Sequence, residues 1–284
     1  MSSNLAEHQT LLKGIINEQM ELLRLSLYVA TQGAAEFRGE KLQCSLSEAK
    51  LKTSQHIALG AGQSVHTIMK CTDWRGIPVR DLYPIARSAV ESFVNASFLL
   101  VESELIAERA VRWVRYRAWK EVNRQVGSGE FTLSISSSDN DPTPPVEFEE
   151  FTAKGACREW SQLDTPSRIR RVGELAGKKA GSRLLGAYAL NYSVSSEVIH
   201  GSPFGVNFFY QAHSELSAIT EDFREATAKQ VNDILLDVSH AAAGYLNAFF
   251  RSQRMNGPFL LEQELFNRLL AFEGVEPQEI EGVN

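Results

Sequence analysis

The sequence contains few cysteines and none of the spacings that bind metals. Cys44, Cys71 and Cys157 lie far apart, and no CxxC pair or HExxH motif occurs. His56 and His66 are ten residues apart, which is not the spacing that places two ligands on one face of a helix. We therefore expect no metal site and no disulfide framework, and a reducing cytoplasm is the simplest compartment.

The common signatures of nucleotide-dependent and hydrolytic enzymes are also missing. The chain has no GxGxxG, no P-loop and no GxSxG motif, so we expect no cofactor. No stretch of about twenty residues is free of charge, and the first residues lack the basic start and apolar run of a signal peptide, so we expect no membrane contact. A net charge of -6 argues against a general attraction to nucleic acid, but a local basic patch remains open.

Apolar residues recur at helical spacing through most of the chain. An apolar fraction of 43% in 284 residues allows a sizeable core, and we expect one helical domain over residues 1–284. The expected helices cover residues 4–31, 45–71, 81–100, 104–126, 146–160, 167–175, 182–200, 220–254 and 260–272. The sequence therefore predicts an all-α bundle of about seven to nine helices.

The segments between these helices show weaker patterns. Residues 127–145 are rich in serine, glycine, aspartate and proline, which predicts a flexible loop. Within this region the segment Phe131 to Ile135 has the clearest strand alternation of the sequence. We expect residues 37–43 to form a simple connection and the acidic segment after residue 272 to be frayed.

The most apolar of the expected helices, residues 81–100, carries a polar stripe. Arg87, Glu91 and Asn95 are four residues apart and therefore share one face. Burying ionised groups without partners costs several kcal/mol, so this stripe predicts partners elsewhere in the fold.

A second stripe lies about a hundred residues later, on the helix expected over 182–200. Tyr188, Tyr192, Ser196 and His200 are also four apart. We expect the two stripes to meet across a helix pair, because that would satisfy both sets of polar atoms. The helix dipole and a nearby Glu91 would both favour the protonated form of His200.

Two interpretations of this cluster remain open. It is either a structural network that holds two helices together, or a site that binds an anion or exchanges a proton. In the second case the catalytic residues would be Arg87, Glu91 and His200. The binding residues would then be Asn95, Tyr188, Tyr192 and Ser196.

The helix expected over 104–126 is basic and aromatic. Its candidate contacts to nucleic acid are Arg112, Arg115 and Trp119. The arginines could contact phosphates, and the tryptophan could stack on a base. The alternative is a solvated cationic face whose tryptophans turn into the core.

Two segments resemble the signature of a known family. ARSAVESFVNASFLL (residues 86–100) and YSVSSEVIHGSP (residues 192–203) resemble the RxxxE and SxxxH pair of an uncharacterised bacterial family of helical domain-of-unknown-function proteins. The segments cover 15 and 12 of the 284 residues. The resemblance implies a site at Arg87, Glu91, Ser196 and His200 and implies no particular reaction.

A looser similarity is to the HEPN class of helical bundles, many of which are metal-independent ribonucleases. Those enzymes carry an arginine and a histidine four to six residues apart on one helix, a spacing that this sequence lacks. An HEPN-like activity would require Arg87 and His200 to form the pair from two helices. The expected functions are thus an intracellular acid-base or anion-binding protein acting on RNA or another phosphate-bearing ligand, or a non-catalytic scaffold or interaction protein. We also expect that the chain can form a homo-oligomer.

Overall fold

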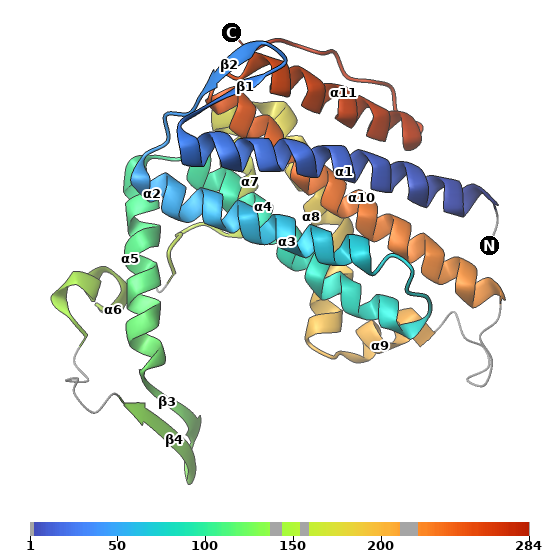
Figure 1. Ribbon diagram of the computed structural model, residues 1–284. Coiled ribbons are helices and arrows are strands. Elements are labelled where there is room, and N and C mark those ends of the chain that lie inside the picture. The colour runs from blue at the N-terminus through green and yellow to red at the C-terminus, as the bar shows by residue number, and fades with distance from the viewer. Residues whose placement is uncertain (1–2, 137–143, 154–158, 211–220, 284) are drawn as a thin grey trace.

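The computed structural model describes residues 3–136, 144–153, 159–210 and 221–283, and these residues form a helical bundle with two small hairpins (Figure 1). The expected all-α class is confirmed. The labelled helices reach α11, so the described part of the chain holds more helices than the seven to nine expected.

Three long helices form the centre of the bundle and were all expected: α4 (Leu82–Val101), α8 (Lys178–Ile199) and α10 (Glu221–Ser252). Every residue from 237 to 250 of α10 is buried, as is typical of a helix that has neighbours on all sides. Small residues allow this close packing. A Cβ added to Gly244 would lie 2.6 Å from Leu184 Cγ, which shows how tightly α10 contacts α8.

The remaining bundle helices surround this centre. They are α1 (Ser3–Gln32), α2 (Glu48–Lys50), α3 (His56–Lys70), α7 (Thr165–Ala176), α9 (Pro203–Tyr210) and α11 (Asn256–Phe272). A π-helical turn over Leu51–Gln55 joins α2 to α3, so the helix expected over 45–71 is one continuous run with an irregular start. Among the described residues, none of the helices combines the length and the hydrophobicity of a membrane span.

The prediction of a simple connection over residues 37–43 is wrong. Strands β1 (Ala34–Phe37) and β2 (Glu40–Gln43) form an antiparallel hairpin there. Arg38 and Gly39 make its two-residue turn with φ of 50° and 84°. Both values are left-handed, as a tight hairpin turn requires.

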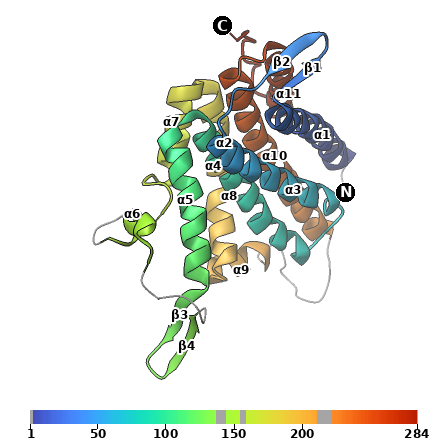
Figure 2. The same ribbon diagram turned by 60° about the vertical axis from the view of Figure 1, so that its left-hand side comes forward.

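A projecting helix and a second hairpin occupy the region expected to be a helix followed by a loop. Helix α5 (Glu104–Glu121) leads away from the bundle and continues into β3 (Asn123–Ser128) and β4 (Phe131–Ser136) (Figures 1 and 2). The strand expected at Phe131 to Ile135 is confirmed. The helix expected to reach residue 126 ends at Glu121, and residues 127–136 of the expected loop belong to the hairpin. Residues 137–143 lie outside the described part of the chain.

The helix expected over 146–160 is also shorter than predicted. A 3-10 turn over Val146–Phe148 leads into α6 (Glu149–Thr152), and residues 154–158 lie outside the described residues. The phenylalanines of this short segment pack on the aromatic side chains of α5.

The segment after α11 is not frayed as expected. The backbone N–H of Gln278 donates to Asn267 Oδ1 at 2.8 Å, and Asn267 Nδ2 donates to the Gln278 carbonyl at 2.8 Å. The acidic composition of the segment gives no sign of these bonds, because they are made by amide side chains of α11 to the backbone.

Candidate functional site

The two polar stripes lie on α4 and α8, which pack antiparallel. Ser195 Oγ, near the end of α8, donates to the carbonyl of Tyr83, near the beginning of α4, at 3.1 Å. Residues further along α4 therefore face residues earlier in α8. This order places Arg87 beside Tyr188 and Tyr192.

Four of the expected residues meet and form what we call the α4–α8 cluster: Arg87, Glu91, Tyr188 and Tyr192. Arg87 Nε donates to Glu91 Oε1 at 2.9 Å, and the Arg87 guanidinium lies 4.5 Å from the centre of the Tyr192 ring. The rings of Tyr188 and Tyr192 are 4.5 Å apart. The predicted meeting of the two stripes is confirmed for these residues, whereas their chemical role stays a prediction.

The surroundings of Tyr188 favour its neutral phenol. Burial is the main cause that raises the pKa of Tyr188 to about 12, and the neighbouring Tyr192 and Glu91 act in the same direction. Tyr188 is therefore a hydrogen-bond donor at neutral pH and a poor general base.

The cluster leaves no space for a ligand in this conformation. The gap lined by Arg87, Glu91, Tyr188 and Tyr192, with two neighbouring side chains, has no room for a water molecule. Arg87 Nη1 is nevertheless buried without a hydrogen-bond partner among the described residues. The cluster is thus closed but not fully satisfied.

Asn95, the third residue of the stripe on α4, contacts a different helix. Its side-chain oxygen accepts a hydrogen bond from Arg168 Nη1 of α7. The Arg168 guanidinium in turn lies 5.0 Å from the centre of the Trp160 ring. Asn95 therefore joins α4 to α7 and is not part of the α4–α8 cluster.

The expected contact between His200 and Glu91 is not formed. His200 is the exposed C-cap of α8, and in the described part of the chain no hydrogen bond or ion pair joins it to Arg87 or Glu91. At 1.5 Å per residue, His200 lies about 12 Å beyond Tyr192 along the helix axis. Since Ser195 already faces Tyr83, the end of α8 extends past the beginning of α4. Ser196 is half-buried and accepts the backbone N–H of His200 at 3.1 Å.

A buried polar network beside the cluster was missed by the sequence analysis. Asn191 Nδ2 of α8 donates to Asp237 Oδ2 of α10 at 2.9 Å, and Asn191 Oδ1 accepts from Ser195 Oγ. Burial raises the pKa of the Asp237 carboxyl well above its ordinary value, Asp233 adds to the effect, and the bond from Asn191 opposes it. The available signals were an aspartate within the long apolar helix α10 and the four-residue spacing of Asn191 and Ser195.

The two arginines expected to contact nucleic acid, Arg112 and Arg115, are paired with acidic residues of the segment around α6. Arg112 Nε donates to Glu150 Oε1 at 2.6 Å, and Arg115 Nη1 lies 3.4 Å from Glu147 Oε2. Trp119 packs against the rings of Tyr116 and Phe148. The arginines are therefore ion-paired and the tryptophan is packed, which weakens the case for an open phosphate-binding face.

The described residues contain no group of three or more histidine, cysteine, aspartate or glutamate side chains placed to hold a metal ion. Comparison of the chain with models of protein families, with curated proteins and with solved structures finds no match.

Proposed function

We propose that this chain is a non-catalytic helical interaction protein that contacts a second copy of itself through the β3–β4 hairpin. In this proposal the α4–α8 cluster stabilises the bundle. The observation that carries the proposal is an apolar hairpin face that is exposed at the end of a projecting helix.

The register of the hairpin separates its side chains into two faces. Val126 pairs with Leu133, and Ser128 pairs with Phe131, so alternate residues place Val126, Phe131 and Leu133 on one face. The other face carries polar residues such as Gln125 and Ser134. The apolar side chains are 49% exposed at Val126, 62% at Leu133 and 88% at Phe131. An exposed patch of this kind is typical of an interaction surface.

Physical arguments favour a second copy as the partner. An isolated two-stranded hairpin is marginally stable in water, and covering its apolar face would stabilise it. A two-fold contact brings identical faces together, so both hairpins would bury the same side chains. Arg124, the charged residue on this face, is already paired with Glu121 at 2.8 Å. The contact would therefore bury little unpaired charge.

The experiment compares two adjacent substitutions on opposite faces of β4. Leu133→Glu places a charge on the apolar face, and Ser134→Glu places the same charge on the polar face. We expect light scattering after size exclusion to find a dimer for the unsubstituted chain and for Ser134→Glu, and a monomer for Leu133→Glu. A monomeric unsubstituted chain throughout the micromolar range would contradict the proposal.

One observation supports a second candidate function, an anion-binding or acid-base site acting on RNA. The buried Arg87 Nη1 has no hydrogen-bond partner among the described residues, and a phosphate oxygen would satisfy it. Arg87 would stabilise the charge of the transition state, and Glu91 with His200 would transfer protons. This function requires a rearrangement that brings His200 to the α4–α8 cluster.

A ribonuclease assay separates the two candidates. If the second is right, Arg87→Met and His200→Ala each abolish cleavage of a labelled RNA, while Ser88→Ala on the exposed side of α4 does not. Equal activity, or equal absence of activity, in all of these proteins would leave the interaction proposal as the one supported.

A further inference from the structure

The segment after α11, residues 275–283, is held through its backbone by side-chain amides of α11. Asn267 exchanges two hydrogen bonds with the backbone of Gln278, both of 2.8 Å. Gln263 does the same with Glu281: it accepts from the Glu281 N–H at 3.2 Å and donates to the Glu281 carbonyl at 2.7 Å. Each amide thus makes the paired bonds that one strand residue makes with its neighbour in a sheet.

A third amide on the same helix continues this pattern. Asn256 Oδ1 accepts from the backbone N–H of Val283 at 3.1 Å. Because these bonds are made to the backbone of the segment, they place few demands on its side chains. This is how proteins bind extended peptides with limited sequence dependence.

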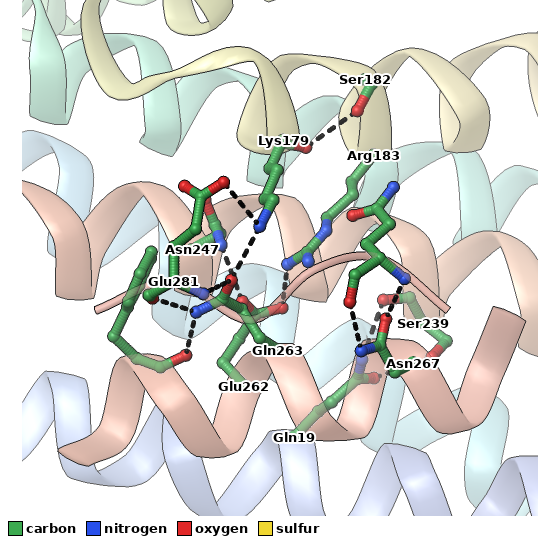
Figure 3. Close-up of polar contacts among 12 residues, drawn as sticks. Gln19, Lys179, Ser182, Arg183, Ser239, Asn247, Glu262, Gln263, Asn267 and Glu281 are labelled. Atoms are coloured by element: carbon green, nitrogen blue, oxygen red, sulfur yellow. Dashed lines mark hydrogen bonds and ion pairs between the residues drawn. The ribbon is translucent and has the colours of Figure 1, made fainter. Parts of the chain in front are cut away.

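We call the surface formed by Asn256, Gln263, Asn267 and Lys179 the groove. Cationic side chains in it and beside it give it a preference for acidic segments. Lys179 Nζ of α8 donates to Gln263 Oε1 at 3.0 Å and also to the carbonyl of Glu279. The same nitrogen lies 3.6 Å from the Glu281 carboxylate, and Figure 3 shows Lys179 pointing between Gln263 and Glu281. Arg251 lines the cavity beside the segment.

The segment is more exposed than Gln263, the middle one of the three amides that hold it. Most residues from Val275 to Gly282 are exposed, and Val283 packs against the core. Gln263, in contrast, is buried. If the segment leaves, the Gln263 amide loses its bonds to Glu281, which is unfavourable unless another ligand replaces them. An exposed segment that is held mainly through its backbone is suited to exchange for another segment that can make the same bonds.

We propose that the groove formed by Asn256, Gln263, Asn267 and Lys179 binds an extended acidic peptide segment of another protein, and that residues 278–283 occupy it as an exchangeable internal ligand. This site is separate from the β3–β4 hairpin and does not depend on the self-association proposed above.

The first experiment weakens the internal ligand and leaves the groove intact. Glu281→Pro in the full chain removes the N–H that donates to Gln263 and also the carboxylate near Lys179. The probe is a fluorescent peptide with the sequence VEPQEIEGV of residues 275–283. A tethered segment competes at an effective concentration on the order of millimolar, so releasing it should tighten binding of the probe by about tenfold or more.

Two controls identify the groove as the binding site. Asn267→Leu also loosens the internal segment but damages the groove, so it should not gain affinity for the probe. Glu264→Leu, on an exposed position of the same helix, should bind as the unsubstituted chain does. A probe whose three glutamates are replaced by lysine should bind Glu281→Pro at least about tenfold more weakly, because Lys179 and Arg251 would repel it. Failure of Glu281→Pro to bind the acidic probe, or equal binding of both probes, overturns the proposal.

A second measurement needs no substitution. In the 15N-labelled full chain, the amides of Gln278, Glu281 and Val283 should exchange slowly with solvent although the segment lies at the surface. An excess of unlabelled acidic peptide should accelerate the exchange of these amides and leave those of α10 unchanged. Unchanged protection at several times the effective concentration of the segment, about 10 mM, would overturn the proposal.

Discussion

Arg183 of α8 and Glu262 of α11 form an ion pair in the interior of the bundle, where each side chain is 1% exposed. Asn247 Nδ2 donates to the second oxygen of Glu262 at 2.8 Å (Figure 3). The Arg183 guanidinium lies 3.9 Å from the centre of the Phe266 ring. This pair connects α11 to the centre of the fold, close to the groove that holds residues 278–283.

Removing one member of this pair should be strongly destabilising. Glu262→Gln keeps the shape of the side chain but leaves the guanidinium of Arg183 without a counter-charge in the core, and we expect a loss of about 3–5 kcal/mol in the free energy of unfolding. The double variant Arg183→Met with Glu262→Leu removes both charges and should recover most of this loss. Urea denaturation of the single and double variants measures the coupling.

The exposed pair of Arg268 and Glu18 is the matched control for this prediction. Its atoms are 2.7 Å apart, but both side chains are 47% exposed. Arg268→Met should therefore change the free energy of unfolding by less than about 1 kcal/mol. If Glu262→Gln had an equally small effect, the interior pair would not have the importance that its burial indicates.

The α4–α8 cluster allows a direct test of its proposed structural role. Arg87→Met removes the bond to Glu91 and the contact with Tyr192, and should lower the free energy of unfolding by about 1–2 kcal/mol. His200→Ala should stay within about 0.5 kcal/mol of the unsubstituted chain, because the imidazole is exposed and makes no contact with the cluster. Thermal and urea unfolding measure both, with Ser88→Ala as the control on α4. A large loss in His200→Ala would mean that His200 has partners in solution that this conformation does not show.

The long helices were predictable because apolar residues recur at helical spacing over many turns of each. One residue that departs from the pattern therefore does not change the prediction of a helix. The end of α8 at His200 was also predictable from the turn signal that follows it. The sequence does not encode directly where two distant helices begin to overlap, and this register decides which stripe residues meet. Tyr188 and Tyr192 face Arg87, whereas His200 lies beyond the beginning of α4.

Short elements and buried charges were harder to predict. The turn at Arg38 and Gly39 has a left-handed residue that is not glycine, so composition alone did not indicate a hairpin. Arg183 and Glu262 were each placed on amphipathic helices where a charged residue usually faces water. Their burial depends on a tertiary contact between α8 and α11, and the two residues are 79 positions apart in the sequence.

Substitution by alanine at two glycines inside helices, Gly60 and Gly181, should change the free energy of unfolding in opposite directions. A Cβ at Gly60 of α3 meets nothing within 4 Å, so Gly60→Ala should stabilise the chain by about 1 kcal/mol through helix propensity. A Cβ at Gly181 of α8 would lie 2.7 Å from the Cα of Gly173 in α7, so Gly181→Ala should cost about 1–3 kcal/mol. Urea denaturation checks both values. Stabilisation by Gly181→Ala would show that α7 and α8 do not approach as closely in solution.

The ion pairs of α5 lead to a prediction about nucleic acid. Glu150 accepts from Arg109 and from Arg112, both at 2.6 Å, and Glu150→Ala removes these bonds. We expect the unsubstituted chain to bind a labelled RNA oligonucleotide weakly. Glu150→Ala should increase the affinity several-fold and steepen its dependence on log salt by about 1 for each additional phosphate contact. Fluorescence anisotropy at several salt concentrations measures both quantities. Glu130→Ala changes the net charge equally on the exposed turn between β3 and β4, and an equal increase in that variant would assign the effect to net charge alone.

Asp237 should make the chain less stable as the pH rises through the acidic range. Burial raises the pKa of its carboxyl in the folded state, while the unfolded carboxyl titrates near its ordinary value of about 3.9. Above that pH the unfolded state releases its proton first, and the folded state must keep its proton or bury a charge. The contribution of Asp237 to stability is therefore fully present below about pH 4 and is lost as the pH rises through the folded pKa.

Asp237→Asn tests this sign, because the amide oxygen still accepts the bond from Asn191 but the side chain cannot ionise. We expect the variant to be more stable than the unsubstituted chain at pH 7, with a difference that decreases toward pH 4. Urea denaturation at steps between pH 4 and pH 8 measures this difference, and Asp73→Asn at an exposed position should show no such trend. If Asp237→Asn is instead less stable at pH 7, the ionised carboxylate must have a partner in solution. The Oδ1 atom of Asp237, which has no hydrogen-bond partner among the described residues, would then be the atom that binds it.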